Sequence, residues 1–127
     1  MNDAFCYVKW HELESEVDYP YTAVAGKDCL TKVGKGVGRI SSSYLIQKHS
    51  IDHLKVALMR GPVSIGVEAI QPIFQKYTGG IIDSIDCGTN YDHGVLAVGY
   101  DKDAATGKEY ILVKNSWGQA WGENGYV

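Results

Sequence analysis

The clearest structural pattern in this 127-residue chain lies in Tyr91–Tyr126, YDHGVLAVGYDKDAATGKEYILVKNSWGQAWGENGY. Gly94–Tyr100 is apolar at odd and even positions alike, which is typical of a strand that is buried on both faces. The polar segment Asp101–Glu109 follows, and Tyr110–Val113 is again rich in β-branched and aromatic residues. The pattern therefore predicts an antiparallel hairpin.

A histidine and an asparagine flank the two strands of this hairpin. His93 opens the first strand and Asn115 follows the second. Because the strands are antiparallel, the start of one and the end of the other lie at the same edge, so we expect the two side chains to be within reach of each other. Taken alone, a histidine before an apolar strand is more often an ordinary surface residue than a catalytic one.

The segments DHGVLAVGY (92–100) and KNSWGQAWGENGY (114–126) resemble the histidine and asparagine regions of the papain family of cysteine peptidases. Two further stretches agree in order with that family, DYPYTA at 18–23 and GPVSI at 61–65 leading to FQKYTGGI at 74–81. The resemblance covers essentially the whole chain and is closest to the cathepsin L-like and plant branches. It implies an α+β papain-like fold, with residues 1–38 left from the helical (left) domain and 39–127 forming most of the antiparallel β-barrel-like (right) domain.

The resemblance also implies the chemistry of a cysteine endopeptidase. His93 would hold the proton of a thiolate–imidazolium pair and deliver it to the leaving amine. Asn115 would accept the imidazole N–H through a neutral amide oxygen, and Trp117 would cover that hydrogen bond from water. Trp121 is expected to be a packing aromatic. Asp92 is a weaker candidate to modulate the charge of His93, because neighbouring side chains on a strand point to opposite faces.

The nucleophile that the resemblance requires is not found in the sequence. The family carries it in an upstream Q-x-x-x-x-x-C-[GS]-x-C-W motif, and Met1–Phe5 resembles the segment that follows the nucleophile helix. We therefore expect a fragment that lacks its N-terminal nucleophile segment and its C-terminal end, and that is inactive alone. The alternative is a non-catalytic relative that acts as a peptide-binding or structural module.

The three cysteines, Cys6, Cys29 and Cys87, cannot all pair within one chain, and their spacing fits no common zinc pattern. The resemblance implies that Cys29 and Cys87 are half-disulfides whose partners lie outside the chain. Cys6, on the apolar face of a predicted helix, is expected to be a buried thiol. A metal site built from Cys87, His93 and an adjacent aspartate is a weaker alternative, since no C-x-x-C or H-x-x-x-H motif frames it.

Substrate preference would depend on residues that match the walls of the family's S2 pocket, which receives the second side chain on the acyl side of the cut bond. These residues are Met1, Gly66, Tyr91 and Gly94. Gly66 has no side chain, which predicts a roomy pocket, and Met1 would supply an adaptable apolar wall. We expect bulky apolar groups such as Leu or Phe to fit, while acceptance of a basic group stays open.

Periodicity and turn residues predict the remaining elements. They are a packing helix within Met1–Trp10 capped by Asn2 or Asp3, irregular turns over Glu14–Gly38, a helix opening at Ser50 and stopped by Gly61-Pro62, a strand with one half-buried face over Val63–Ala69, a short helix within Ile70–Tyr77, and a strand at Ile81-Ile82. His11, His49 and His53 are expected to be solvated.

Composition narrows the classes of partner. A net charge of -3 and a pI near 5.7 give no electrostatic reason to expect nucleic acid or an anionic membrane as a partner. The sequence contains no apolar run of transmembrane length and no signal peptide at Met1. The resemblance implies a peptide or protein substrate, a propeptide or cystatin-like inhibitor, no cofactor, and a lysosomal or secreted location.

Overall fold

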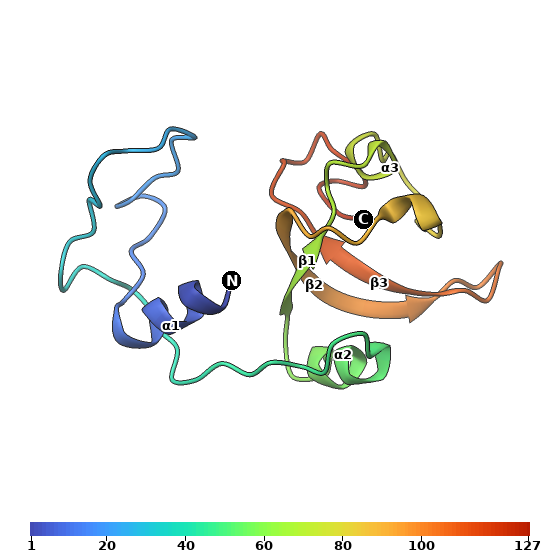
Figure 1. Cartoon of the computed structure of the whole chain (residues 1–127), viewed down its shortest axis with the longest axis horizontal. Helices are drawn as coiled ribbons and strands as arrows, with labels where there is room; N and C mark the ends of the chain where they lie inside the picture. Colours follow the sequence, from blue (N-terminus) through green and yellow to red (C-terminus); the bar gives the residue numbers. More distant parts are fainter. The chain divides into compact units, whose positions relative to one another are not determined.

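The computed structural model describes residues 1–127, which form two compact units, Met1–Leu45 and Ile46–Val127. Both units can be followed along the chain in Figure 1. The expected boundary after residue 38 lies a few residues before this division, because Gly38 and Ile40 still bond to the first unit. The Leu13 N–H donates to the Gly38 carbonyl at 2.8 Å, and the Ile40 N–H donates to the Val8 carbonyl at 3.4 Å. The assignment of 1–38 and 39–127 to two family domains stays a prediction.

The first unit consists of helix α1 (Asn2–Trp10) followed by irregular segments. The turns expected over 14–38 are confirmed, but the N-cap position of α1 is Met1, which makes no side-chain cap, so the predicted caps at Asn2 and Asp3 are wrong. No residue of this unit is buried, and Cys6 is exposed, which contradicts both the packing helix and the buried thiol. The physical reason is that a single short helix among turns offers no second apolar layer to pack against.

The second unit is built on a three-stranded antiparallel sheet in the order β1-β2-β3. The strands are β1 (Val63–Val67), β2 (His93–Lys102) and β3 (Glu109–Lys114), so the predicted hairpin is confirmed. The pairing of β2 with β3 shifts register between Ala97 and Gly99. Ala97 is fully buried, at 0% exposure, which places the core on this face of β2.

Two helices flank the sheet. Figure 1 shows α2 (Ile51–Leu58) below the sheet and α3 (Pro72–Gln75) above it. Both helices were predicted. The Ser50 hydroxyl caps α2 by accepting the His53 N–H at 3.3 Å, and Leu54 is the buried residue of its apolar face.

Two strand predictions need correction. β1 ends at Val67 and is half-buried at every position, so the expected alternation to residue 69 fails, and Glu68 is buried although the alternation placed it on the polar face. The segment Ile81-Ile82 is irregular and leads into a 3₁₀ turn, η1 (Ile85–Cys87). Before it, Gly80 has φ +87° and its N–H donates to the Glu123 carboxylate at 2.8 Å, so this backbone bonds to a side chain instead of a ladder.

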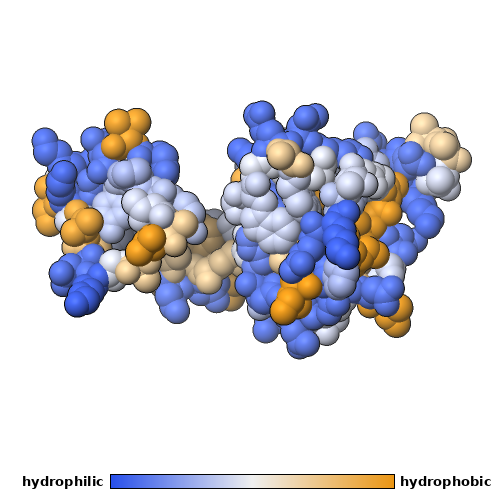
Figure 2. Space-filling view, turned by 90° about the horizontal axis from the view of Figure 1, so that it is seen from above, coloured by the Kyte–Doolittle hydropathy of each residue, from blue (hydrophilic) through white to orange (hydrophobic).

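The surface is chemically mixed. Figure 2 shows hydrophobic residues scattered among hydrophilic ones on both units. No helix has the length and apolar character needed to span a membrane.

Candidate active site

The side chains of His93 and Asn115 meet at one edge of the sheet. His93 is the first residue of β2, and Asn115 directly follows β3, whose last residue Lys114 pairs with Leu96. The His93 Nε2 atom lies 2.8 Å from the Asn115 Oδ1 atom. The contact predicted from the antiparallel hairpin is therefore confirmed.

The neighbours of Asn115 determine which nitrogen of His93 carries the proton. The Ser116 N–H also donates to Asn115 Oδ1, at 2.8 Å, so two donors converge on this atom and it must be the amide oxygen. An oxygen can only accept, and His93 therefore donates through Nε2. Its Nδ1 atom forms no hydrogen bond within the chain and is left to exchange a proton with a reacting group.

Asn115 is itself held rigidly. Its side chain is 8% exposed, and its backbone N–H donates to the Gly125 carbonyl at 2.9 Å. The Nδ2 atom is buried and has no partner. Because the oxygen of this buried amide accepts two hydrogen bonds, the amide has one orientation, and it therefore fixes the ring plane of His93.

An aromatic cluster covers the imidazole. The indole of Trp117 stacks on His93 with ring centroids 5.2 Å apart and an interplanar angle of 29°. Trp121 supports Trp117 edge-on at 5.3 Å and donates its indole N–H to the Gln75 carbonyl at 3.1 Å. Phe74 packs against both tryptophans, at 5.5 Å and 5.0 Å. The cluster anchors Trp117 over His93, which is the arrangement that a shielding role needs.

Asp92 points away from the imidazole. Its carboxylate accepts the Ala69 N–H at 2.6 Å and the Ile70 N–H at 3.2 Å, just beyond the end of β1. The opposite orientation of neighbouring side chains, expected from the strand, is confirmed. Asp92 joins two backbone segments and makes no hydrogen bond with His93.

Three of the four expected S2 residues lie together. Gly66 of β1 pairs with Gly94 of β2, and a Cβ atom added at Gly66 would lie 3.2 Å from the Cβ atom of Tyr91. The base of the Tyr91 side chain thus bounds the space that the missing side chain of Gly66 leaves. Met1 belongs to the first unit.

None of the three cysteines is bonded to His93, and all three are free thiols. Cys29 is exposed and its Sγ lies 2.9 Å from the Thr31 hydroxyl oxygen. Hydrogen bonds from the Thr31 hydroxyl and backbone N–H lower the pKa of the Cys29 thiol. Cys87 is half-buried at the end of η1. The expected roles of Cys29 and Cys87 as half-disulfides stay predictions.

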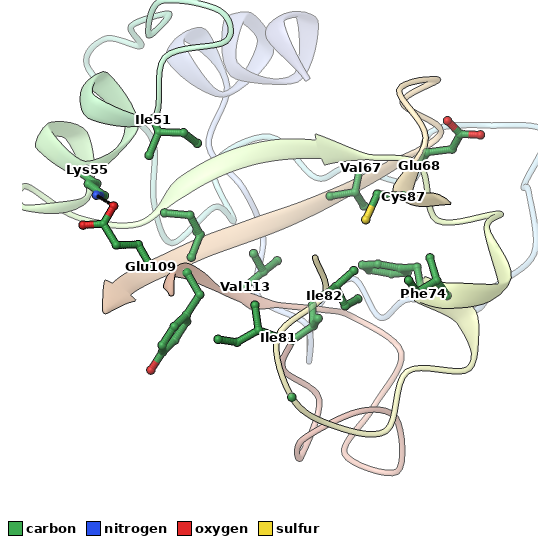
Figure 3. A pocket seen from close by; sticks show the side chains of 15 residues that line it. Ile51, Lys55, Val67, Glu68, Phe74, Ile81, Ile82, Cys87, Glu109 and Val113 are labelled. Carbon is green, nitrogen blue, oxygen red and sulfur yellow. Dashed lines mark hydrogen bonds and ion pairs between the residues drawn. The ribbon is translucent and has the colours of Figure 1, made fainter. Parts of the chain in front are cut away.

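A cavity of about 510 Å³ lies in the second unit (Figure 3). Its lining is mostly apolar and includes Val67, Phe74, Ile81, Ile82, Cys87 and Val113. Neither His93 nor Asn115 lines it. The cavity is therefore separate from the place where a peptide would meet His93.

Sequence patterns missed the burial of Glu68, which lies just beyond the end of β1. It is 8% exposed, although it follows a strand whose pattern predicted a solvated position. Its carboxylate accepts the Asn90 N–H and the Gln71 side-chain amide, each at 2.6 Å. Both donors lie outside β1, so the only signal in the sequence was an acidic residue directly after an apolar strand.

Comparison with known proteins identifies the family. The family model described as "Papain family cysteine protease" matches residues 1–127. Cysteine protease 1 of Oryza sativa subsp. japonica is 44% identical over 128 residues, which cover 100% of this chain and 26% of the relative. Papaya proteinase 4 of Carica papaya is 42% identical over 127 residues, covering 95% of this chain and 34% of the relative. The chain belongs to the papain family of cysteine proteases.

Solved structures agree with this assignment. Digestive procathepsin L 3 of the Tenebrio molitor larval midgut matches with a TM-score of 0.89 and 36% identity, over 99% of this chain and 41% of the other. The bromelain protease of Ananas comosus matches with a TM-score of 0.85 and 33% identity, over 98% of this chain and 56% of the other. The α+β papain-like fold is confirmed. The chain spans about a quarter to a third of the length of the two relatives named above.

Proposed function

We propose that this chain supplies the histidine–asparagine part of a papain-like cysteine endopeptidase, and that the nucleophilic cysteine comes from a segment outside the 127 residues. The observation that carries the proposal is the 2.8 Å hydrogen bond between His93 and Asn115 beneath Trp117, in a chain of this family. The three cysteines present do not bond to His93, and the sequence has no Q-x-x-x-x-x-C-[GS]-x-C-W motif.

In the proposed reaction, the thiolate attacks the peptide carbonyl carbon while His93 is protonated on both nitrogens. The C–N bond then breaks, and the proton on Nδ1 of His93 moves to the leaving amine. In the second half of the reaction, neutral His93 takes a proton from a water molecule while the oxygen of that water attacks the thioester carbon. The C–S bond breaks, which releases the carboxylic acid product and restores the thiolate. Asn115 holds Nε2–H throughout, so Nδ1 always faces the reacting atoms.

The neutral amide of Asn115 suits this role because it orients the ring without adding a negative charge beside the thiolate. Trp117 supports the role by covering the bond with apolar surface, since a hydrogen bond is stronger where water is excluded. Trp121 and Phe74 act only through the placement of Trp117.

On the substrate side, Gly66, Tyr91 and Gly94 form one wall of the proposed pocket for the second residue before the cut bond, and the resemblance to the family adds Met1 to the residues proposed for this pocket. The proposed preference is for an apolar side chain such as Leu or Phe, because the wall offers backbone and an aromatic ring. A propeptide or a cystatin-like inhibitor would occupy the same groove. The proposed location is lysosomal or secreted, and Cys29 and Cys87 would pair with cysteines outside the chain.

A chimera tests the proposal. Residues 1–127 replace the aligned 128-residue segment of the rice relative, and hydrolysis of a fluorogenic Phe-Arg peptide is measured. The chimera should cleave the peptide, His93→Ala in it should abolish cleavage, and the isolated chain should show none. Cleavage by the isolated chain that disappears in His93→Ala would overturn the proposal. A folded chimera that binds the peptide without cleaving it would favour a binding module instead.

A further inference from the structure

The proposed mechanism gives no role to the buried carboxylate of Glu68. Figure 3 shows Glu68 at the edge of the cavity beside Val67, with its carboxylate turned toward the loop that carries Cys87. The Asn90 N–H donates to Oε2 and the Gln71 side-chain amide donates to Oε1, each at 2.6 Å. These bonds lower the pKa of Glu68, the Asn90 bond most, while burial opposes them. The group is therefore a charged acceptor at neutral pH.

The loop approaches this carboxylate very closely at Gly88. A Cβ atom added there would overlap both oxygens of Glu68, and Gly88 has φ +69°, which favours glycine. The close approach leaves no room for a side chain between the loop and the carboxylate. The loop therefore packs its backbone directly against the Glu68 carboxylate, in addition to the hydrogen bond that Asn90 donates to it.

Two hydrogen bonds of Asp92 anchor the other end of the same loop. The Asp92 N–H donates to the Val67 carbonyl at 3.1 Å, and the Asp92 carboxylate accepts the Ala69 N–H at 2.6 Å. Glu68 therefore fixes Asn90, and the end of β1 fixes Asp92. The residue between these two anchored positions is Tyr91, whose side chain packs over Gly66.

We propose that Glu68 is a positioning residue that holds Tyr91 against Gly66 and thereby sets the width of the substrate pocket on that side. The inference rests on the proposed function in that it takes the Tyr91–Gly66 wall as part of the pocket. Glu68 touches neither the substrate nor the imidazole. Loss of the Glu68 carboxylate should change which substrate side chains are bound, and this change should appear in KM. Proton transfer at His93 should be unchanged, since the sheet and the neighbouring Asp92 still hold His93 in place.

The first arm of the test needs no catalysis. In the unaltered 127-residue chain, the Asn90 amide should be protected from hydrogen exchange, and Glu68→Met should accelerate its exchange about 10-fold or more, because a bond to a charged acceptor is lost. Protection at Val95 and Ala97 reports whether the sheet is intact. Glu68→Gln keeps an oxygen for Asn90, since Gln71 can turn its amide, and should retain most of the protection.

Two further variants complete this arm. Gly88→Ala should displace the carboxylate and accelerate Asn90 exchange as Glu68→Met does. Glu109→Met removes a carboxylate from the opposite end of the hairpin and should leave Asn90 unchanged. An Asn90 amide that is unprotected in the unaltered chain, or equally protected in Glu68→Met with an intact sheet, would overturn the inference.

The second arm uses the chimera with the rice relative and two peptides that carry Leu or Val at the second position. Glu68→Met should reduce the Leu-over-Val ratio of kcat/KM by about 3- to 10-fold, with kcat within about 2-fold, because the wall moves while the chemistry stays. An unchanged ratio despite fast Asn90 exchange would refute the specificity role. If the chimera with Glu68 intact cleaves neither peptide, the proposed function fails, and the exchange result still decides whether Glu68 anchors the loop.

Discussion

The hydrogen bond between Asn115 and His93 can be tested by truncation in the chimera. Asn115→Ala removes the acceptor that lies 2.8 Å from Nε2, and leaves the imidazole N–H without a partner beneath Trp117. A fully buried unpaired donor costs about 1–3 kcal/mol, and because His93 is half-buried this range is an upper bound, which corresponds to a loss of at most about 5- to 150-fold in kcat/KM if the whole cost falls on the transition state. Most of the loss should appear in kcat, because the bond orients a catalytic group and does not contact the peptide.

Trp117→Ala acts on the same bond by a different route. Trp117 is 42% exposed, so the cover is partial, and admitting water should weaken the bond without removing it. We expect a loss of about 3- to 10-fold, again mainly in kcat. With Asn115 already truncated there is no bond to shield, so the double variant should lose clearly less than the product of the single losses.

The assay is kcat/KM for the Phe-Arg peptide across the four members of the cycle, with a pH profile for each variant. Trp10→Ala, at a tryptophan that is 74% exposed, controls for the loss of an indole elsewhere in the chain. Multiplicative losses would refute the shielding role, and would indicate that Trp117 acts as a wall for the leaving-group side of the substrate.

Three further outcomes are expected. Hydrogen bonds lower the pKa of Glu68 on folding, so its carboxylate stabilises the chain above pH about 4.5, and this contribution is lost as the pH falls through the folded-state pKa. The free energy of unfolding in urea should therefore fall less on acidification in Glu68→Gln than in the unaltered chain. Ala97→Leu inserts a larger side chain at a position with 0% exposure and should cost about 1–3 kcal/mol in unfolding free energy, read as a lower Tm, whereas no loss would mean that the core has free space there. Hydrogen exchange should be fast over 14–38 and slow in β2 and β3, and uniform protection would contradict the absence of buried residues in the first unit.

The hairpin and the His93–Asn115 contact could be predicted because both depend on local pattern. Apolar runs on either side of a polar turn define the two strands, and antiparallel pairing then fixes which ends meet. The side-chain contact could be expected from the backbone alone, because His93 begins β2 and Asn115 directly follows β3, the antiparallel strand paired with it.

Glu68 could not be predicted, because a buried carboxylate is defined by its donors, and the Asn90 N–H lies 22 residues away in the sequence. The segment Ile81-Ile82 has strand-forming residues, but the preceding Gly80 N–H donates a hydrogen bond to Glu123, 43 residues further along the chain, instead of to a neighbouring strand. The apolar face of α1 was visible in the sequence, but a pattern identifies a face and not the surface that covers it.

The rate of peptide cleavage by the chimera with and without His93 tests whether this histidine is the general acid and base of the reaction. We predict that the chimera cleaves the Phe-Arg peptide and that His93→Ala lowers kcat/KM by at least about 10³-fold, because the general acid and base of the reaction is lost. A His53→Ala chimera, altered at an exposed histidine of α2, should match the unaltered chimera. Cleavage that persists in the His93→Ala chimera would rule out His93 as the general acid and base.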